Sequence, residues 1–243
     1  MLNLFFVPDL PTTVGSTYEF AGDDAGHAIR VLRTQIGEAL ALSSGQGAWS
    51  IVEVIAIAKK SMTVRVVSTG FEEALPVEFT VAQALTKGDR IKESIELNTA
   101  GGADVILLWA ATRSIGKGTP DLMQKLATTA REASKQTRRN RIPFVMGVLD
   151  AKKIAAEIPN YDLAIVFHES ASQKLTDVVK TGVKTGVKKV LIIIGPEGGI
   201  TDEELAQFKS AGAQVALMGR PIFRSAHAGM AALSGVNAAL KIW

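Results

Sequence analysis

A glycine-rich loop follows a strongly apolar segment and carries the clearest chemical signal in the chain. Residues 190–205 read VLIIIGPEGGITDEEL, so an apolar strand leads directly into the segment 195–199. Thr201 and Glu204 have the spacing of a capping box that starts a helix. Glycines in such a loop let a ligand approach the backbone closely.

The composition of this loop narrows the class of ligand. The loop has neither the GxGxxG pattern nor the P-loop lysine. Glu197 would repel a phosphate, but it can accept hydrogen bonds from ribose hydroxyls or an ammonium group. The loop therefore favours a nucleoside-like ligand without phosphates, although a plain strand–turn–helix connection explains the motif equally well when it is taken alone.

A second strand end of the same kind lies 20 to 30 residues further along the chain. Residues 214–233 read QVALMGRPIFRSAHAGMAAL, in which a strand ends at Gly219 and an irregular stretch leads into a helix of small residues. Met218, Ile222 and Phe223 can wall an adenine slot, and Arg224 can face phosphate or a developing charge. The alternative is a set of core apolar residues with one surface arginine.

Basic residues gather in two places that suit a phosphate backbone. Residues 130–141, AREASKQTRRNR, hold five basic side chains and one acidic one. Arg30 and Arg33 are three apart, on one face of an expected helix. Such clusters attract nucleic acid, but by charge alone a solvated helix face is an equal alternative for the 130–141 segment.

The histidines offer candidate proton acceptors and no metal site. The chain has three histidines and no cysteine, and no HxxH or HExxH spacing occurs, so a zinc enzyme is disfavoured and no metal is expected. His168 ends a strand, where it can line a ligand site or be a structural histidine. His227 follows the second loop and is a candidate catalytic base.

The elements that would position these residues fall into two regions. Up to about residue 70, short strands dominate (2–7, 39–43, 49–57 and 61–69), with one helix around 23–32, which indicates a small β-barrel. The stretch 68–76 has the composition of a linker. The two regions also differ in charge, because residues 1–72 hold 5 Lys/Arg and 7 Asp/Glu and the remainder holds 22 and 17.

From residue 77, strands and helices alternate. The expected strands are 77–85, 104–111, 143–148, 163–169, 188–195 and 214–219, and the expected helices include 90–99, 121–138, 151–157, 202–210 and 226–242. Continuous apolar strands alternating with helices predict an α/β fold with a largely parallel sheet, whose ligands bind at the carboxyl ends of the strands. Trp109 is expected in the core.

These segments together resemble the RsmE family of 16S rRNA uridine N3-methyltransferases, which belongs to the SPOUT superfamily. The GPEGG loop at 195–199 and MGRPIFRS at 218–225 match the family's two loop motifs. HAIRVLRTQIGE at 27–38 is similar to its N-terminal RNA-contacting signature. KGDRIKESIELNTAGGADVILLWAATRS at 87–114 and REASKQTRRNRIPFV at 131–145 are similar to two further segments. The matches cover nearly the whole chain in the family's order.

The resemblance implies a fold, a cofactor and a set of site residues. The fold is a SPOUT-type trefoil-knot α/β methyltransferase domain (73–243) preceded by a PUA-like β-barrel RNA-binding domain (1–72). The cofactor is S-adenosylmethionine, held by loops at Phe167, His168, Ile194, Gly195, Pro196, Glu197, Gly198, Gly199, Leu217, Met218, Gly219, Ile222 and Phe223. RNA would contact Arg30, Arg33, Arg131, Arg138 and Arg139. Arg224 and His227 are the candidate catalytic residues.

The sequence departs from the family pattern at its second loop, which leaves an alternative function open. The family's Thr-Glu-Thr after the arginine is Ser225-Ala226-His227 here, and its usual leucine is Phe223. An rRNA-binding ribosome assembly factor that has kept the fold and lost activity is therefore the second hypothesis. A dinucleotide-dependent oxidoreductase is disfavoured by the missing GxGxxG and by Glu197.

The remaining expectations concern partners and location. The expected partners are 16S rRNA and the small ribosomal subunit. A homodimer is expected from the small-residue final helix, which must pack against another element or a second subunit, and from the family's habit of pairing. The apolar runs are too short for a membrane helix, and the N-terminus lacks a signal peptide's basic region, so a cytoplasmic protein is expected.

Overall fold

The computed structural model describes residues 2–182 and 186–242, which form two compact units. The first unit comprises residues 1–74 together with 134–142, and the second comprises 75–133 together with 143–243. No helix within the described ranges is long and apolar enough to cross a membrane.

The first unit is built on a five-stranded sheet in the order β1-β3-β4-β5-β2. Its strands are β1 (Leu4–Phe6), β2 (Thr17–Ala21), β3 (Ala39–Ser43), β4 (Ala48–Ile57) and β5 (Ser61–Phe71), with helix α1 (Asp23–Arg30) between β2 and β3. The β1–β3 pair is parallel and the other pairs are antiparallel. Alternate residues of β4 and β5, such as Val52, Val54 and Val64, are fully buried in its core.

The structure corrects two sequence-based expectations in this unit. The stretch 68–76 is not all linker, because β5 continues to Phe71 and pairs with β4 as far as the Ala48–Phe71 partners. Strand β2 was not expected; it has a single buried residue, Phe20, so it shows only a weak alternation.

The first unit also contains residues 134–142, which come from much later in the chain. Gly47 N–H donates to the Asn140 carbonyl at 2.9 Å, and Ile142 N–H donates to the Gly45 carbonyl at 2.9 Å. The Lys135 ammonium forms a 2.6 Å ion pair with Asp24, and these two side chains are 10% and 24% exposed. The C-terminal half of the basic segment 130–141 is therefore built into the N-terminal unit.

The second unit is a six-stranded parallel sheet in the order β11-β9-β10-β6-β7-β8. Its strands are β6 (Glu78–Ala84), β7 (Val105–Ala110), β8 (Phe144–Asp150), β9 (Leu163–Phe167), β10 (Lys189–Ile194) and β11 (Gln214–Ala216). The expected parallel α/β fold is confirmed. Strand β11 stops at Ala216, so Leu217 to Gly219 already lie in the following loop.

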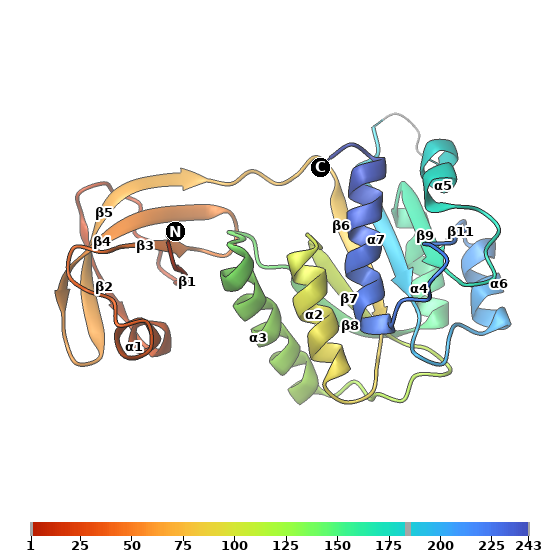
Figure 1. Cartoon of the computed structure of the whole chain (residues 1–243), viewed down its shortest axis with the longest axis horizontal. Helices are drawn as coiled ribbons and strands as arrows, with labels where there is room; N and C mark the ends of the chain where they lie inside the picture. Colours follow the sequence, from red (N-terminus) through yellow and green to blue (C-terminus); the bar gives the residue numbers. More distant parts are fainter. Residues whose placement is uncertain (1, 183–185, 243) are drawn as a thin grey trace. The chain divides into compact units, whose positions relative to one another are not determined.

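Helices cover both faces of this sheet, which is why the central strands β6 and β10 are buried from their second residue onward. Helices α2 (Arg90–Ala100) and α7 (Ser225–Ala239) pack together on one face, with α5 (Leu175–Gly182) beside α7 (Figure 1). Helices α4 (Ala151–Glu157) and α6 (Asp202–Ser210) cover the other, with the short helix η1 (Ile158–Asn160) after α4. Helix α3 (Pro120–Thr137) begins in this unit, and its residues from Ser134 onward belong to the first.

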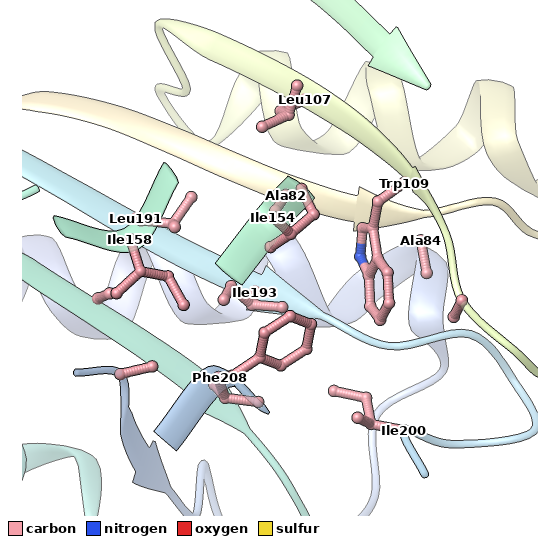
Figure 2. Packing of buried hydrophobic residues seen from close by; sticks show 14 residues of the cluster. Ala82, Ala84, Leu107, Trp109, Ile154, Ile158, Leu191, Ile193, Ile200 and Phe208 are labelled. Atoms are coloured by element: carbon pink, nitrogen blue, oxygen red, sulfur yellow. The ribbon is translucent and has the colours of Figure 1, made fainter. Parts of the chain in front are cut away.

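Trp109 lies in the core, as expected from the sequence, and is fully buried between the sheet and α6 (Figure 2). Its ring meets Phe208 edge-on, with centroids 5.5 Å apart. Its indole N–H donates to the Ile194 carbonyl at 3.1 Å. This hydrogen bond fixes the end of β10 just where the glycine-rich loop begins.

The small residues of α7 allow it to pack closely against α2. A Cβ at Gly229 would collide with the Asn98 side chain, and a Cβ at Gly101 would lie 3.1 Å from Leu233. The buried face of α7 is therefore covered by another element of the same chain, which is one of the two arrangements that the sequence left open.

Candidate functional site

Three loops at the carboxyl ends of neighbouring strands enclose one cavity. These loops follow β9, β10 and β11, which are adjacent in the sheet. The cavity is lined by every residue that the sequence assigned to a cofactor, namely Phe167, His168, Ile194, Gly195, Pro196, Glu197, Gly198, Gly199, Leu217, Met218, Gly219, Ile222 and Phe223. The structure thus brings together residues that are up to 56 positions apart in the sequence.

Further lining residues were missed by sequence reasoning: Glu169, Ile200, Pro221, Ser225 and Ala228. Glu169 and Pro221 are direct neighbours of predicted residues, so their place in the loops was the available signal. Ser225 and Ala228 lie in the first turn of α7. Their inward direction depends on how that helix meets the sheet, which the sequence does not show.

The glycines around the cavity serve different purposes. A Cβ at Gly219 would have only Pro221 Cδ nearby, at 3.9 Å, and one at Gly199 would meet only an Arg113 nitrogen at 3.7 Å. By contrast, a Cβ at Gly195 would lie 2.7 Å from Ile200, and one at Gly198 would lie 3.0 Å from Arg113 Cβ. Gly199 and Gly219 leave open space for a ligand, whereas Gly195 and Gly198 are needed for packing within the protein.

Two arginines brace the glycine-rich loop from outside. Arg90, at the start of α2, forms an ion pair with Glu197 at 3.3 Å. The Arg113 guanidinium donates to the Gly198 carbonyl at 2.9 Å. Because the Glu197 side chain is 27% exposed and its partner 53% exposed, the ion pair is open to solvent and weak enough for a ligand to compete with it.

His168 is held in one orientation by the turn that follows β9. Its Nδ1 accepts the Ser170 backbone N–H at 3.2 Å and lies 2.8 Å from Ser170 Oγ. A ring nitrogen that accepts a backbone N–H carries no proton, so the neutral ring has its proton on Nε2. His168 can therefore donate a hydrogen bond from Nε2 to a ligand in the cavity.

The two candidate catalytic residues lie at the start of α7. Arg224 precedes the helix, is exposed, and stands between Phe223 and Ser225, which both line the cavity. His227 Nε2 lies 2.9 Å from Glu93 Oε1 of α2, and both side chains are about half exposed. Neither Arg224 nor His227 is among the described residues that line the cavity itself.

A buried carboxylate joins two segments next to the glycine-rich loop. Glu204, 3% exposed, accepts hydrogen bonds from Thr112 N–H at 2.7 Å, Thr112 Oγ1 at 2.9 Å and Thr201 N–H at 2.9 Å. The expected capping box of Thr201 and Glu204 is confirmed. Glu204 also ties the loop after β7 to the start of α6, a contact that the sequence could not reveal.

The candidate RNA-contacting arginines divide between the two units. Arg30, Arg33, Arg138 and Arg139 belong to the first unit, and Arg131 belongs to the second. Arg33 and Arg138 have φ values of 56° and 57°, in the left-handed region that favours glycine. Arg138 occupies the position after α3 where a glycine is common, since Arg138 N–H and Arg139 N–H donate back to Lys135 and Ser134.

Two family models match the chain. Residues 73–237 match a model described as an RNA methyltransferase domain, and residues 20–67 match one described as an RNA methyltransferase PUA domain. The chain is 32% identical to the ribosomal RNA small subunit methyltransferase E of Mycobacterium bovis, over 99% of this chain and 93% of that protein. It is 25% identical to the protein of the same name from Bacillus subtilis, covering 91% and 90% of the two chains.

Solved structures show the same fold. A Legionella pneumophila protein described as a methyltransferase, in complex with the bound cofactor SAM, matches with a TM-score of 0.86 and 25% identity over 98% of both chains. A ribosomal RNA small subunit methyltransferase E from Neisseria gonorrhoeae, bound to S-adenosyl methionine, matches with a TM-score of 0.87 and 21% identity over 98% of both chains.

Proposed function

The chain belongs to the RNA methyltransferase family that includes ribosomal RNA small subunit methyltransferase E, and from this premise we propose that it methylates N3 of a specific uridine in 16S rRNA. It is an S-adenosylmethionine-dependent rRNA methyltransferase. The observation that carries the proposal is the cavity at the carboxyl ends of β9, β10 and β11, because it collects all the residues assigned to the methyl donor.

The cavity suits a nucleoside with an amino-acid tail. Gly199 and Gly219 leave space beside the backbone, and the apolar walls include Met218, Ile222 and Phe223. Glu197 and Glu169 provide carboxylates for ribose hydroxyls or an ammonium group. These two acids disfavour a phosphate-bearing ligand, since a carboxylate and a phosphate repel each other.

S-adenosylmethionine supplies a methyl group on a sulfonium, which is electrophilic enough that the protein's task is to position the base and stabilise its deprotonated form. Uridine N3 must lose its proton before it can attack. The negative charge then spreads over the ring, where a nearby cation stabilises it. We assign this role to the Arg224 guanidinium, which stands exposed at the rim between two lining residues.

His227 is the proposed proton acceptor. If the ring is neutral and its Nε2 donates to Glu93, the unprotonated nitrogen is Nδ1, which can take the N3 proton. Since the two side chains are about half exposed, RNA can reach this pair from solvent. A variant His227→Ala should lower the rate, and the loss should shrink as the pH is raised toward the range where N3 ionises without a base.

We propose that the first unit is an RNA-binding domain of the PUA-like β-barrel type. Its match to the PUA model and four of its arginines, Arg30, Arg33, Arg138 and Arg139, support this role. We propose Arg131 of the second unit as a further RNA contact. For the second unit we propose the trefoil knot of the SPOUT superfamily, in the segments that carry the two loop motifs.

We also propose a homodimer, a cytoplasmic location and 16S rRNA within the small ribosomal subunit as substrate. Small residues of α7 remain at least partly exposed after α2 has covered its buried face, among them Ala231 and Ala238. Such a surface can pack closely on its own copy across a twofold axis. Light scattering at working concentration tests the proposed homodimer, and a measured monomer mass would contradict it.

The experiment for the proposed function combines calorimetry with turnover. The wild-type protein should bind S-adenosylmethionine and not NAD, and should transfer its methyl group to small-subunit rRNA. Arg224→Ala should bind the methyl donor normally but lose most of its rate at saturating RNA. Binding without any turnover by the wild type would instead indicate an inactive assembly factor, and normal turnover by Arg224→Ala would contradict its catalytic role.

A further inference from the structure

A run of buried hydrogen bonds leads from the middle of the sheet to the glycine-rich loop. Asn98 Nδ2 of α2 donates to Gln83 Oε1 of β6 at 3.4 Å, and Gln83 Nε2 donates to Ser225 Oγ of α7 at 3.1 Å. Ser225 Oγ in turn donates to the Gly195 carbonyl at 2.6 Å. Two consecutive elements, β6 and α2, thus share one polar network with α7 and the loop after β10.

The location of this network is costly unless it serves a purpose. Gln83 and Asn98 are fully buried and Ser225 is 7% exposed. A buried polar side chain must keep its hydrogen bonds, because each lost partner leaves a desolvated group unsatisfied. Replacing both partners of a buried hydrogen bond by apolar groups of the same shape can be nearly neutral for stability, so the network invites a functional explanation as well.

The network ends where the two cofactor loops meet. Gly195 is the first residue of the loop after β10, and Ser225 is the first residue of α7, directly after the loop that follows β11. Both residues line the cavity. The 2.6 Å hydrogen bond from Ser225 to Gly195 therefore joins the loop after β10 to the start of α7. The hydrogen bond from Gln83 connects Ser225 to β6, a central strand of the sheet.

Asn98 adds a second restraint on α7. A Cβ at Gly229 would collide with the Asn98 side chain, so α7 rests directly on this amide one turn after Ser225. Gln83 and Asn98 together therefore hold the N-terminal part of α7, from Ser225 to Gly229, in place.

We propose that Ser225 and Gln83 are positioning residues for methyl transfer, which hold the loops after β10 and β11 at the separation that the methyl donor requires. This inference rests on the proposed function of the cavity. The positioning acts on the shape of the site, so its loss should raise Kd and KM for S-adenosylmethionine more than it lowers kcat at saturation.

The test is calorimetry and steady-state kinetics with the full chain. Ser225→Ala should weaken S-adenosylmethionine binding about tenfold, the effect of one lost buried hydrogen bond. Gln83→Leu should weaken it to a similar extent. The double variant should lose less than the product of the two effects, because both substitutions break the same network.

Two matched variants separate positioning from general loss of stability. Ser234→Ala removes a hydroxyl from the same helix, where Ser234 Oγ donates to the Met230 carbonyl at 3.0 Å, so the affinity should stay unchanged. Ser225→Thr keeps the hydroxyl and should restore wild-type affinity. Thermal unfolding of each variant shows how much folded protein is present.

The outcomes distinguish this inference from the function on which it rests. If the wild type does not bind S-adenosylmethionine, the assignment of the cavity is wrong and the inference falls with it. If the wild type binds and folded Ser225→Ala and Gln83→Leu bind equally well, only the positioning role is overturned. A fall in kcat with unchanged KM would likewise contradict it.

Discussion

Glycine residues in the two cofactor loops offer a direct test of the cavity at the scale of single residues. Gly219 is the better target, because a side chain there meets open space and its backbone is not in the left-handed region. Gly199 also faces open space, but its φ of 77° would strain any other residue. A loss of binding at Gly199 would therefore mix backbone strain with steric exclusion.

We expect Gly219→Val to weaken S-adenosylmethionine binding at least tenfold while leaving the unfolding temperature nearly unchanged, because the branched side chain fills space that the ligand needs. Gly199→Val should weaken binding and also destabilise the fold, by about 1 kcal/mol or more. Calorimetry and thermal unfolding measure both effects. Unchanged affinity in folded Gly219→Val would show that the ligand lies elsewhere.

At Arg138, the backbone conformation favours glycine, whereas the proposed contact with RNA needs the arginine side chain. Its φ of 57° suits glycine, yet the position carries an exposed arginine. Arg138→Gly should stabilise the protein by up to about 1 kcal/mol. The same change should weaken RNA binding and reduce its salt slope by about one unit, because one phosphate contact is lost.

The matched control for Arg138 is Gln136→Gly, which places glycine inside α3 two residues earlier. It should destabilise the protein by about 1 kcal/mol and leave RNA affinity unchanged. Urea unfolding and binding at two salt concentrations provide the measurements. A stabilised Arg138→Gly variant that binds RNA with the wild-type salt slope would remove Arg138 from the proposed RNA surface.

Asp162 makes the free energy of unfolding depend on pH, in a direction that follows from its lowered pKa. Its carboxylate accepts backbone N–H groups of Lys188 and Lys189, which lowers its pKa below the usual 3.8. A carboxyl with a depressed folded-state pKa stabilises the fold above its unfolded pKa, and this stabilisation declines as the pH falls below 3.8. Asp162→Asn should be less stable than wild type at pH 6, with the difference shrinking toward pH 3 in urea unfolding.

At the scale of elements, Glu204 connects a helix start with a neighbouring loop. Glu204→Ala would leave Thr112 and Thr201 donors without their acceptor, so it should cost about 2 to 4 kcal/mol in the free energy of unfolding. The exposed neighbour Glu203→Ala should cost less than about 0.5 kcal/mol. Equal effects of the two substitutions would show that the Thr112 contact contributes nothing.

Much of the order of strands and helices could be predicted from the sequence, because apolar runs and capping residues are local patterns. Apolar runs such as that of β10 predicted buried parallel strands, and the Thr201–Glu204 spacing predicted the start of α6. Strand β2 escaped notice because only Phe20 is buried in it. The linker was placed too early because the polar end of β5, up to Phe71, resembles a loop.

The contacts that shape the site could not be predicted, because they join residues that are distant in sequence. The Gln83–Ser225 hydrogen bond spans 142 positions, and the His227–Glu93 pair spans 134. Loop residues were easier to find, since the end of a parallel strand is itself a signal for a ligand site. Membership of 134–142 in the first unit depends on pairing with Gly45 and Gly47, which no local pattern reveals.

At the scale of the whole molecule, we expect the two units to have separate roles, RNA binding in the first and methyl transfer in the second. The first holds four of the candidate RNA-contacting arginines, and the second holds the cavity with its rim residue Arg224. A variant Arg30→Ala/Arg33→Ala should therefore weaken RNA binding with no change in S-adenosylmethionine affinity. An unchanged salt slope for RNA in this variant would contradict the division.

The most direct test of the central claim is the identity of the methylated product. Small ribosomal subunits or 16S rRNA lacking the modification would be incubated with the protein and isotopically labelled S-adenosylmethionine, then digested to nucleosides for mass spectrometry. We expect labelled 3-methyluridine at a single site in the wild-type reaction, strongly reduced with Arg224→Ala at saturating RNA. Label in a different nucleoside, or no label in rRNA although the protein binds the methyl donor, would contradict it.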